Sequence, residues 1–198
     1  MSEPRFSLDG ATRLRQEVKK SLFIANAAPI ATPDAALAFV AAVAQSDATH
    51  HCWAYRIGQQ YRFHDDGEPG GTAGRPILQA IDGQRMDRTV VVVARWYGGI
   101  KLGAGGLARA YGGCAAECLR LAAKTEIVAL TCVEFALPYT TLPLLHARLA
   151  ELQADLLNEN FSADGATLRL ALPSTQVAAL RRLLADATRG RCEVTVLA

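Results

Sequence analysis

Strong charge of either sign is missing from this sequence of 198 residues. Its 21 lysine and arginine residues face 19 aspartate and glutamate residues, which leaves a formal net charge of +2 and a pI of about 8.3. This balance lacks the basic excess of an obligate nucleic-acid binder. The charge is uneven, however, because residues 1–126 carry 15 basic against 12 acidic side chains (+3) and residues 127–198 carry 6 against 7 (−1). An anionic partner is therefore expected to bind the first part.

Long apolar runs are also missing. None approaches the ~20 residues that span a bilayer, and the N-terminal stretch MSEPRFSLDG lacks the apolar core of a secretory signal. The five cysteines are odd in number and scattered, which indicates reduced core thiols. Cys114 and Cys118 have no second ligand pair, which argues against zinc. We therefore expect a cytoplasmic protein that has no membrane contact, no bound metal and no cofactor.

What the sequence does contain is enough apolar material for a core, with 51% hydrophobic and 20% charged residues. The first part alternates β-branched runs with helical stretches. Thr32, Pro33 and Asp34 form a typical helix start. We predict strands over 11–20, 21–30, 50–57, 61–64 and 89–96, and helices over 32–46, 76–81 and 105–123.

From about Ile127 the glycines become rare and the pattern changes to βαββαβ. This order is that of a ferredoxin-like fold. Its strands are predicted over 127–137, 155–161, 167–172 and 192–197, and its helices over 142–152 and 174–187. The expected architecture is α+β with two domains, 1–124 and 127–198, and the boundary falls within 122–126.

Twelve of the 16 glycines lie between Gly67 and Gly113. One group follows the apolar run 89–96 and precedes a predicted helix: Gly98, Gly99, Gly103, Gly105 and Gly106. A glycine turn that enters a helix can bind an anion with its unpaired N–H groups. The nearby cations would add charge: Arg75, Arg95, Lys101 and Arg109. Alternatively, the glycines only let the helix pack closely on its sheet.

Two nucleotide-binding patterns were considered for this turn. Residues 103–108 satisfy G-x-G-x-x-A, but they lie beyond the end of the strand and belong to no repeated βαβ half. The pattern G-x-x-x-x-G-K-[ST] is absent from the sequence. Neither pattern therefore identifies a nucleotide cofactor.

Histidines and carboxylates form a second group, which lies in or near the glycine-rich loop 64–75. Its candidates for a metal site or for general acid–base chemistry are His51, Asp65, Asp66 and Glu68. Adjacent strand residues point to opposite faces, so His50 and His51 cannot both bind one ion without a bulge. The carboxylates are equally explained as turn-forming residues or as partners that neutralise a nearby arginine.

Aromatic residues interleaved with arginine form a third group, which is typical of surfaces that stack unpaired bases. Trp53 and Tyr97 are the candidates for stacking. Strand alternation places Trp53 and Tyr55 on one face, so at least half of the aromatic rings are expected in the core.

Three stretches of the first part carry a family resemblance: HHCWAYRIG, DDGEPGGTAGRPIL and VVVVARWYGGIKLGAGGLARAYGG. They resemble the signature blocks of the IMPACT family, and their arrangement is similar to its bacterial YigZ branch. The block R-[FYW]-[FYW]-G-G-x-x-L-G, at 95–103, is specific. Within the pattern, Leu22 stands where arginine is expected and Lys101 where an aliphatic residue is common.

The resemblance implies a first domain with the left-handed βαβ fold of a ribosomal small-subunit protein and of elongation factor G, an exception to the usual crossover handedness. It also implies a tail similar to the fifth domain of elongation factor G. Eukaryotic relatives regulate translation by competing with the kinase that phosphorylates initiation factor 2 for a ribosome-associated activator. They use an additional partner-binding domain that we do not find here, so this mechanism does not transfer intact.

The leading hypothesis is a non-enzymatic, translation-associated protein that binds RNA or a ribosome-associated protein, and not DNA, through its first domain. It assigns phosphate contacts to Arg75, Arg95, Lys101 and Arg109, and stacking to Trp53 or Tyr97. A rival hypothesis is a phosphatase-like or peptidase-like hydrolase that uses His51, Asp65, Asp66 and Glu68. A third is a protein-interaction module, which would expose an apolar patch.

Overall fold

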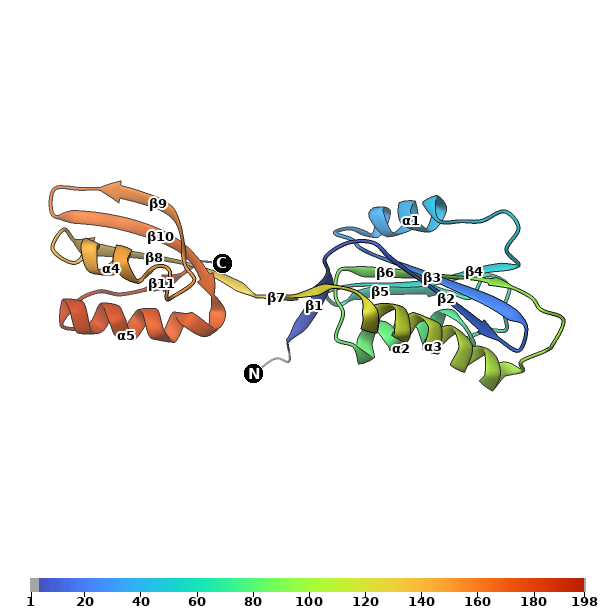
Figure 1. Cartoon of the computed structure of the whole chain (residues 1–198). Coiled ribbons are helices and arrows are strands. Elements are labelled where there is room, and N and C mark those ends of the chain that lie inside the picture. The colour runs from blue at the N-terminus through green and yellow to red at the C-terminus, as the bar shows by residue number, and fades with distance from the viewer. Residues whose placement is uncertain (1–3, 198) are drawn as a thin grey trace. The chain divides into compact units, whose positions relative to one another are not determined.

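The computed structural model describes residues 4–197, and the chain divides after Ile127 into two compact units (Figure 1). The first unit has apolar clusters on both faces of a sheet, and the second unit has a cluster of its own. The fold is α+β, as the sequence predicts. Within the described residues, no helix is both long and apolar enough to cross a membrane.

The first unit is built on a five-stranded antiparallel sheet of order β2-β3-β6-β4-β5. The five strands lie within two residues of the predicted ranges: β2 (Thr12–Val18), β3 (Ser21–Pro29), β4 (His50–Ile57), β5 (Gln60–His64) and β6 (Thr89–Trp96). The β-branched run of β6 makes it the central strand, because Val91 and Val93 pack into one core and Val90 and Val92 into the other.

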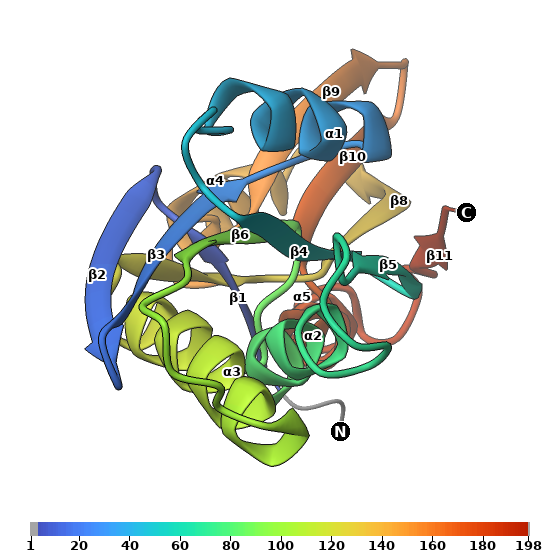
Figure 2. The ribbon, with the colours of Figure 1, turned by 90° about the vertical axis from the view of Figure 1, so that its right-hand side faces the viewer.

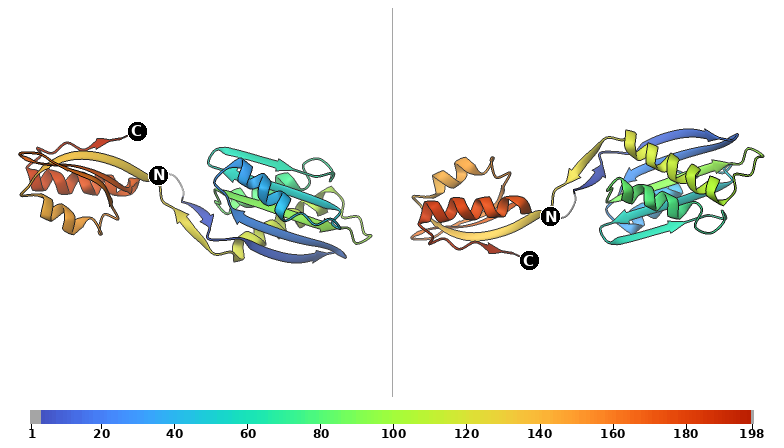
Figure 3. Two further views of the ribbon diagram at one scale, coloured as in Figure 1. Left: turned by 90° about the horizontal axis from the view of Figure 1, so that it is seen from above. Right: turned by 90° about the horizontal axis from the view of Figure 1, so that it is seen from below.

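Three helices cover the two faces of this sheet (Figures 2 and 3). Helix α1 (Pro33–Ala42) connects β3 to β4 on one face of the sheet. Strands β3 and β4 each run antiparallel to β6, which lies between them, so they are parallel to each other and form the predicted βαβ unit with α1. Helices α2 (Gly74–Gly83) and α3 (Ala104–Leu121) lie side by side on the other face.

Helix α1 ends at Ala42 rather than continuing to 46, because the chain must return to β4. The backbone N–H of Gln45 donates to Nε2 of His51 at 3.0 Å instead of extending the helix. Helix α2 begins at Gly74, two residues earlier than predicted. Its first N–H groups are satisfied by a carboxylate of the preceding loop, which is described below.

A two-stranded sheet was not predicted. Strand β1 (Arg5–Leu8) pairs antiparallel with β7 (Lys124–Ile127). The predicted strand over 127–137 is therefore two elements, because β8 (Leu130–Pro138) begins separately in the second unit. The local pattern of four residues cannot reveal a partner that lies so far away in the sequence.

The second unit has the predicted βαββαβ order and a sheet of order β11-β8-β10-β9, which is the ferredoxin-like arrangement. Leu168 and Leu170 of the central β10 pack with Leu180 and Leu184 of α5. The last strand covers only two of the six residues predicted. The remaining elements are α4 (Leu142–Arg148), β9 (Asp155–Phe161), β10 (Gly165–Pro173), η1 (Ser174–Gln176), α5 (Val177–Thr188) and β11 (Thr195–Val196).

Candidate anion-binding cavity

Asp65 organises the loop between β5 and α2. Its Oδ1 accepts hydrogen bonds from the backbone N–H groups of Ala73 at 3.0 Å and Gly74 at 2.8 Å, and its Oδ2 accepts one from Gly71 at 2.8 Å. Burial alone would raise the pKa of this carboxyl, but the three N–H donors hold the pKa below its ordinary value. Asp65 therefore caps α2 and fixes the loop, and both of its oxygens are engaged.

Asp66 connects the same loop to the start of β4. Its Oδ2 accepts the backbone N–H of His51 at 2.6 Å, and its carbonyl oxygen accepts from Nδ1 of His50 at 2.7 Å. Because a carbonyl oxygen only accepts, Nδ1 of His50 carries a proton. His51 accepts from Gln45 through Nε2 and lies outside the cavity described below, whereas His50 lines it. His51, the histidine proposed for the acidic cluster, therefore lies apart from the cavity, and the neighbouring His50 faces it.

Glu68 lies buried beneath the loop. Its Oε1 accepts from Nη1 of Arg95 at 2.5 Å and from the hydroxyl of Tyr111 at 2.7 Å, and Nε2 of His50 lies 3.9 Å away. Burial raises the pKa of the Tyr111 phenol far above its ordinary value, and the neighbouring Cys52 and Glu68 raise it further, so the phenol remains a proton donor. Glu68 is therefore the partner that compensates Arg95.

The proposed acidic cluster is thus divided among three structural tasks. Asp65 caps a helix, Asp66 holds β4, and Glu68 compensates a buried arginine. Among residues 4–197, no group of three or more His, Cys, Asp or Glu side chains could hold a metal ion. Each of the three acidic side chains thus has a structural partner.

Arg95, at the end of the central strand, is only 5% exposed. Its guanidinium lies over the rings of Phe23 and Tyr97, at 5.6 and 5.5 Å from their centroids. Its Nε has no hydrogen-bond partner within the described chain, although it is buried. The planar group is therefore held firmly from several sides while one donor remains unused.

A cavity of about 440 Å³ opens beside Arg95. Its walls combine His50 and Glu68 with the exposed Lys101, the half-exposed ring of Tyr97, and the start of α3 at Gly103 and Ala104. The full lining is Thr49, His50, Glu68, Pro69, Arg95, Tyr97, Lys101, Leu102, Gly103, Ala104 and Leu107. A buried cation, an exposed cation and the N–H groups of a long helix thus converge on one space.

The glycines of the turn serve two different purposes. Gly98 allows close packing, because a Cβ there would lie 2.0 Å from the carbonyl oxygen of Lys20. Gly99 and Gly103 have φ values of +83° and +71°, which other residues adopt with strain. Gly105 and Gly106 form the first turn of α3, and a Cβ at Gly106 would press on Leu102 at 3.0 Å. Gly98 therefore allows the turn to approach the β2–β3 hairpin closely, whereas Gly99 and Gly103 supply the positive φ values that the turn needs.

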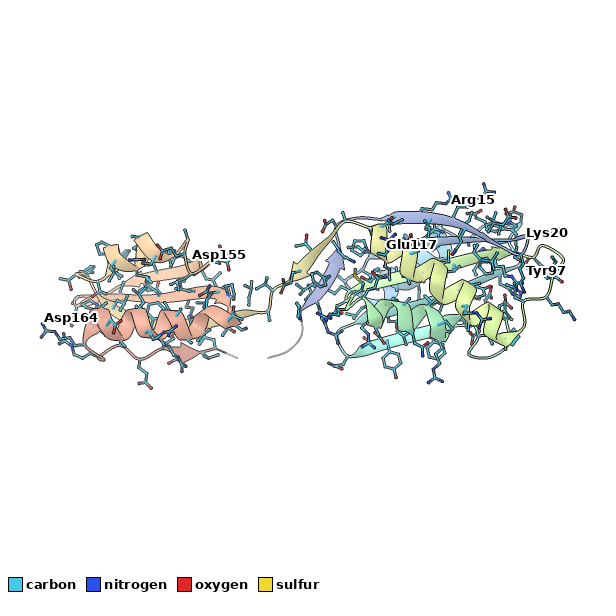
Figure 4. All side chains as sticks on the ribbon, turned by 60° about the horizontal axis from the view of Figure 1, so that its bottom comes forward. Arg15, Lys20, Tyr97, Glu117, Asp155 and Asp164 are labelled. Atoms are coloured by element: carbon cyan, nitrogen blue, oxygen red, sulfur yellow. The ribbon has the colours of Figure 1, made fainter. Side chains whose placement is uncertain are left out.

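Three other candidates lie elsewhere. Trp53 is 7% exposed and packs under α1, stacked on Tyr55 with ring centroids 6.1 Å apart, so it cannot stack a base. Arg75 is exposed on α2 and does not line the cavity. Arg109 lines a neighbouring hollow. Of the two rings proposed for stacking, only Tyr97 is exposed at the cavity, and Figure 4 shows it at the same end of the first unit as Lys20.

The fold is that of a two-unit α+β protein whose first unit has a cavity lined by Arg95, Lys101 and the start of α3. The Impact N-terminal domain family matches residues 19–119, and a family described as a domain of unknown function, DUF1949, matches residues 135–191. The chain belongs to the IMPACT family.

Several relatives resemble the chain over almost its whole length. It is 46% identical over 177 residues to the "IMPACT family member in pol 5'region" of Thermus thermophilus. This alignment covers 88% of this chain and 97% of the relative. It is 39% identical over 189 residues to the IMPACT family member YigZ of Escherichia coli, which covers 92% of each. A solved structure described as that of a hypothetical protein is 36% identical, with a TM-score of 0.65 over 100% of this chain and 99% of that one.

Proposed function

We propose that this protein is a translation-associated RNA-binding protein whose first unit binds a phosphodiester of single-stranded RNA in the cavity beside Arg95. The observation that carries this proposal is the convergence of Arg95, Lys101 and the N-terminus of α3 next to the exposed ring of Tyr97. Phosphate oxygens match the donors, and a base matches the ring.

The charge around the cavity favours a phosphodiester. Arg95 and Lys101 supply two positive charges, Glu68 supplies one negative charge, and a helix N-terminus adds roughly half a positive charge. The sum is between one and two positive charges, which suits the single negative charge of a phosphodiester. The Glu68 carboxylate would oppose the second charge of a phosphomonoester more strongly, since it lies in the same wall.

The side chain of Tyr97 is suited to stacking a base. The guanidinium of Arg95 covers one face of its ring, 5.5 Å from the ring centroid, and the residue is 48% exposed. Stacking of one base on an aromatic side chain contributes about 1–3 kcal/mol, with little preference among bases. The expected binding therefore depends weakly on sequence and strongly on salt.

Membership of the IMPACT family supports a role in translation, because the family is connected with its regulation. The hydrolase alternative loses support at Asp65 and Asp66, whose carboxylates are bound to backbone N–H groups. The same hydrogen bonds support the RNA-binding proposal, since they hold the loop that carries Glu68 and Pro69 along one wall of the cavity.

The test is fluorescence anisotropy with a short labelled single-stranded RNA at several salt concentrations. Lys101→Ala should weaken binding about tenfold and reduce the magnitude of the salt slope by about 0.7, which corresponds to one lost phosphate contact on a single strand. Tyr97→Ala should weaken binding by about 1–2 kcal/mol with an unchanged slope. Arg182→Ala, an exposed arginine of α5 in the second unit, is the charge-matched control.

Wild-type protein that shows no salt-dependent binding would overturn the proposal. It would also be overturned if Lys101→Ala and Tyr97→Ala bound RNA as tightly as Arg182→Ala. Partner proteins recovered from lysate equally well with and without nuclease would support the protein-interaction alternative instead.

A further inference from the structure

A second hollow, of about 210 Å³, lies against the first cavity. Leu102 lines both spaces, so this side chain is the ridge between them. The second hollow is formed by β2, the β2–β3 turn and one side of α3. Its lining is Gln16, Val18, Lys19, Leu102, Gly106, Arg109 and Ala110.

The second hollow is more basic than the first. Lys19 and Arg109 line it, and no carboxylate does. Within residues 4–197, neither of these cations has an ion-pair partner. The guanidinium of Arg109 lies along the first turn of α3, where a Cβ at Gly105 would be 3.5 Å from its Nη1.

The turn that supplies Lys19 has an unfavourable sequence for its shape. Val18 pairs with Ser21, which leaves Lys19 and Lys20 as a two-residue hairpin loop. Both have positive φ, 46° and 67°, the arrangement that Asn-Gly adopts readily and other residues adopt with strain. Two lysines are thus held at a position where neither is favoured by local conformation.

The backbone fixes this turn next to the RNA-binding cavity. The carbonyl oxygen of Lys20 lies so close to Gly98 that a Cβ on the glycine would be 2.0 Å away. Ser21 accepts the backbone N–H of Gly98 at 3.2 Å and contacts Nη2 of Arg95 at 3.5 Å. The hairpin tip is therefore in direct contact with the Arg95 end of β6 and with the turn that follows it.

We propose that the RNA strand leaves the cavity, crosses Leu102 and places its next phosphate in the second hollow, where Lys19 and Arg109 bind it. This inference rests on the proposed function. It identifies the ligand as a strand with at least two consecutive phosphodiesters, rather than a mononucleotide, and it explains why cations occupy a strained turn.

The decisive variant is Lys19→Asn combined with Lys20→Gly, which gives the turn the residues that its conformation prefers. Oligouridylate and the dinucleotide UpU, which has a single phosphodiester, are the probes. The variant should melt at a higher temperature than wild type, because the strain is relieved. It should nevertheless bind oligouridylate about tenfold more weakly, with a salt slope reduced by about 0.7. Arg109→Ala should also weaken oligouridylate binding, and both variants should bind UpU as wild type does.

The outcomes separate this inference from the proposed function. If wild type fails to bind oligouridylate, the proposed function fails. If wild type binds and Lys101→Ala weakens binding, while the turn variant and Arg109→Ala retain wild-type affinity and slope, the second subsite is wrong and the cavity alone binds RNA. A loss of UpU binding in the turn variant would also contradict the inference, since it would place the turn in the first subsite.

Discussion

Arg95 at the end of β6 and Glu68 in the β5–α2 loop form a buried ion pair, in which Nη1 donates to Oε1 at 2.5 Å. The pair joins the central strand to the loop that forms one wall of the cavity. Tyr111 of α3 donates to the same oxygen, so strand, loop and helix meet at one carboxylate. The position of the cavity walls therefore depends on this contact.

Removing either partner of this pair should destabilise the first unit. Arg95→Met or Glu68→Gln should each cost about 3 kcal/mol, because each leaves a buried polar partner uncompensated. The double variant should cost clearly less than the sum of the two. Urea unfolding followed by tryptophan fluorescence measures this, since Trp53 and Trp96, the two tryptophans, both lie in the first unit. Additive costs would contradict the coupling.

Gly98 and Gly99 should respond very differently to alanine. Gly98→Ala places a Cβ 2.0 Å from the carbonyl oxygen of Lys20, which forces the turn and the hairpin apart and should cost about 3 kcal/mol. Gly99→Ala meets no atom within 4 Å and adds only the strain of a positive φ, about 1 kcal/mol. Thermal unfolding of the two variants compares them, and equal costs would show that Gly98 does not serve close packing.

Asp65 should stabilise the fold only when it is ionised. Its pKa in the folded state lies below the ordinary value of about 3.9, so its contribution is complete above that pH and is lost as the pH falls through the folded-state pKa. Asp65→Asn should cost about 2 kcal/mol at pH 7, a figure already reduced for solvent screening at this half-buried group. The difference in the free energy of unfolding between Asp65→Asn and wild type, measured by urea unfolding, should narrow below about pH 4. A difference that does not change with pH would contradict this assignment.

The five thiols should differ sharply in reactivity. Burial raises the pKa of Cys52 and Cys114 to about 12 and that of Cys118 to about 11, whereas Cys132 is exposed. Because the thiolate is the reactive form, iodoacetamide at pH 8 should modify Cys132 rapidly and leave these three unmodified in the native protein. Mass spectrometry with and without denaturant provides the readout, and rapid native labelling of Cys52 would contradict the buried position.

The sequence predicts elements best where the pattern is local. The run Thr89–Trp96 consists mainly of β-branched residues and was predicted as a strand, and the alternation after Ile127 predicted the ferredoxin-like order. The pairing of β1 with β7 was missed because it depends on distant residues. The turn at Lys19 and Lys20 carries no turn-forming residue, so the hairpin tip could not be recognised.

The connections among the candidate residues could not be predicted from the sequence. The sequence suggested that the acidic loop neutralises a nearby arginine, and only the fold selects Arg95 for Glu68 and adds Tyr111. Strand alternation indicates that His50 and His51 face opposite sides, yet it does not reveal which side carries the cavity. For the same reason Trp53 was a candidate for stacking until the sheet was seen to place it beneath α1.

Occupancy of the cavity can be observed directly at the side chain of Arg95. In ¹⁵N-labelled full-length protein, the held guanidinium should give a resolved Nε–H resonance, because this group is buried and without a partner in the described chain. Addition of single-stranded RNA should shift that resonance together with the backbone amides of Lys101, Gly103 and Ala104. An RNA titration that leaves these signals unchanged, or that shifts only signals of the second unit, would contradict the proposed function.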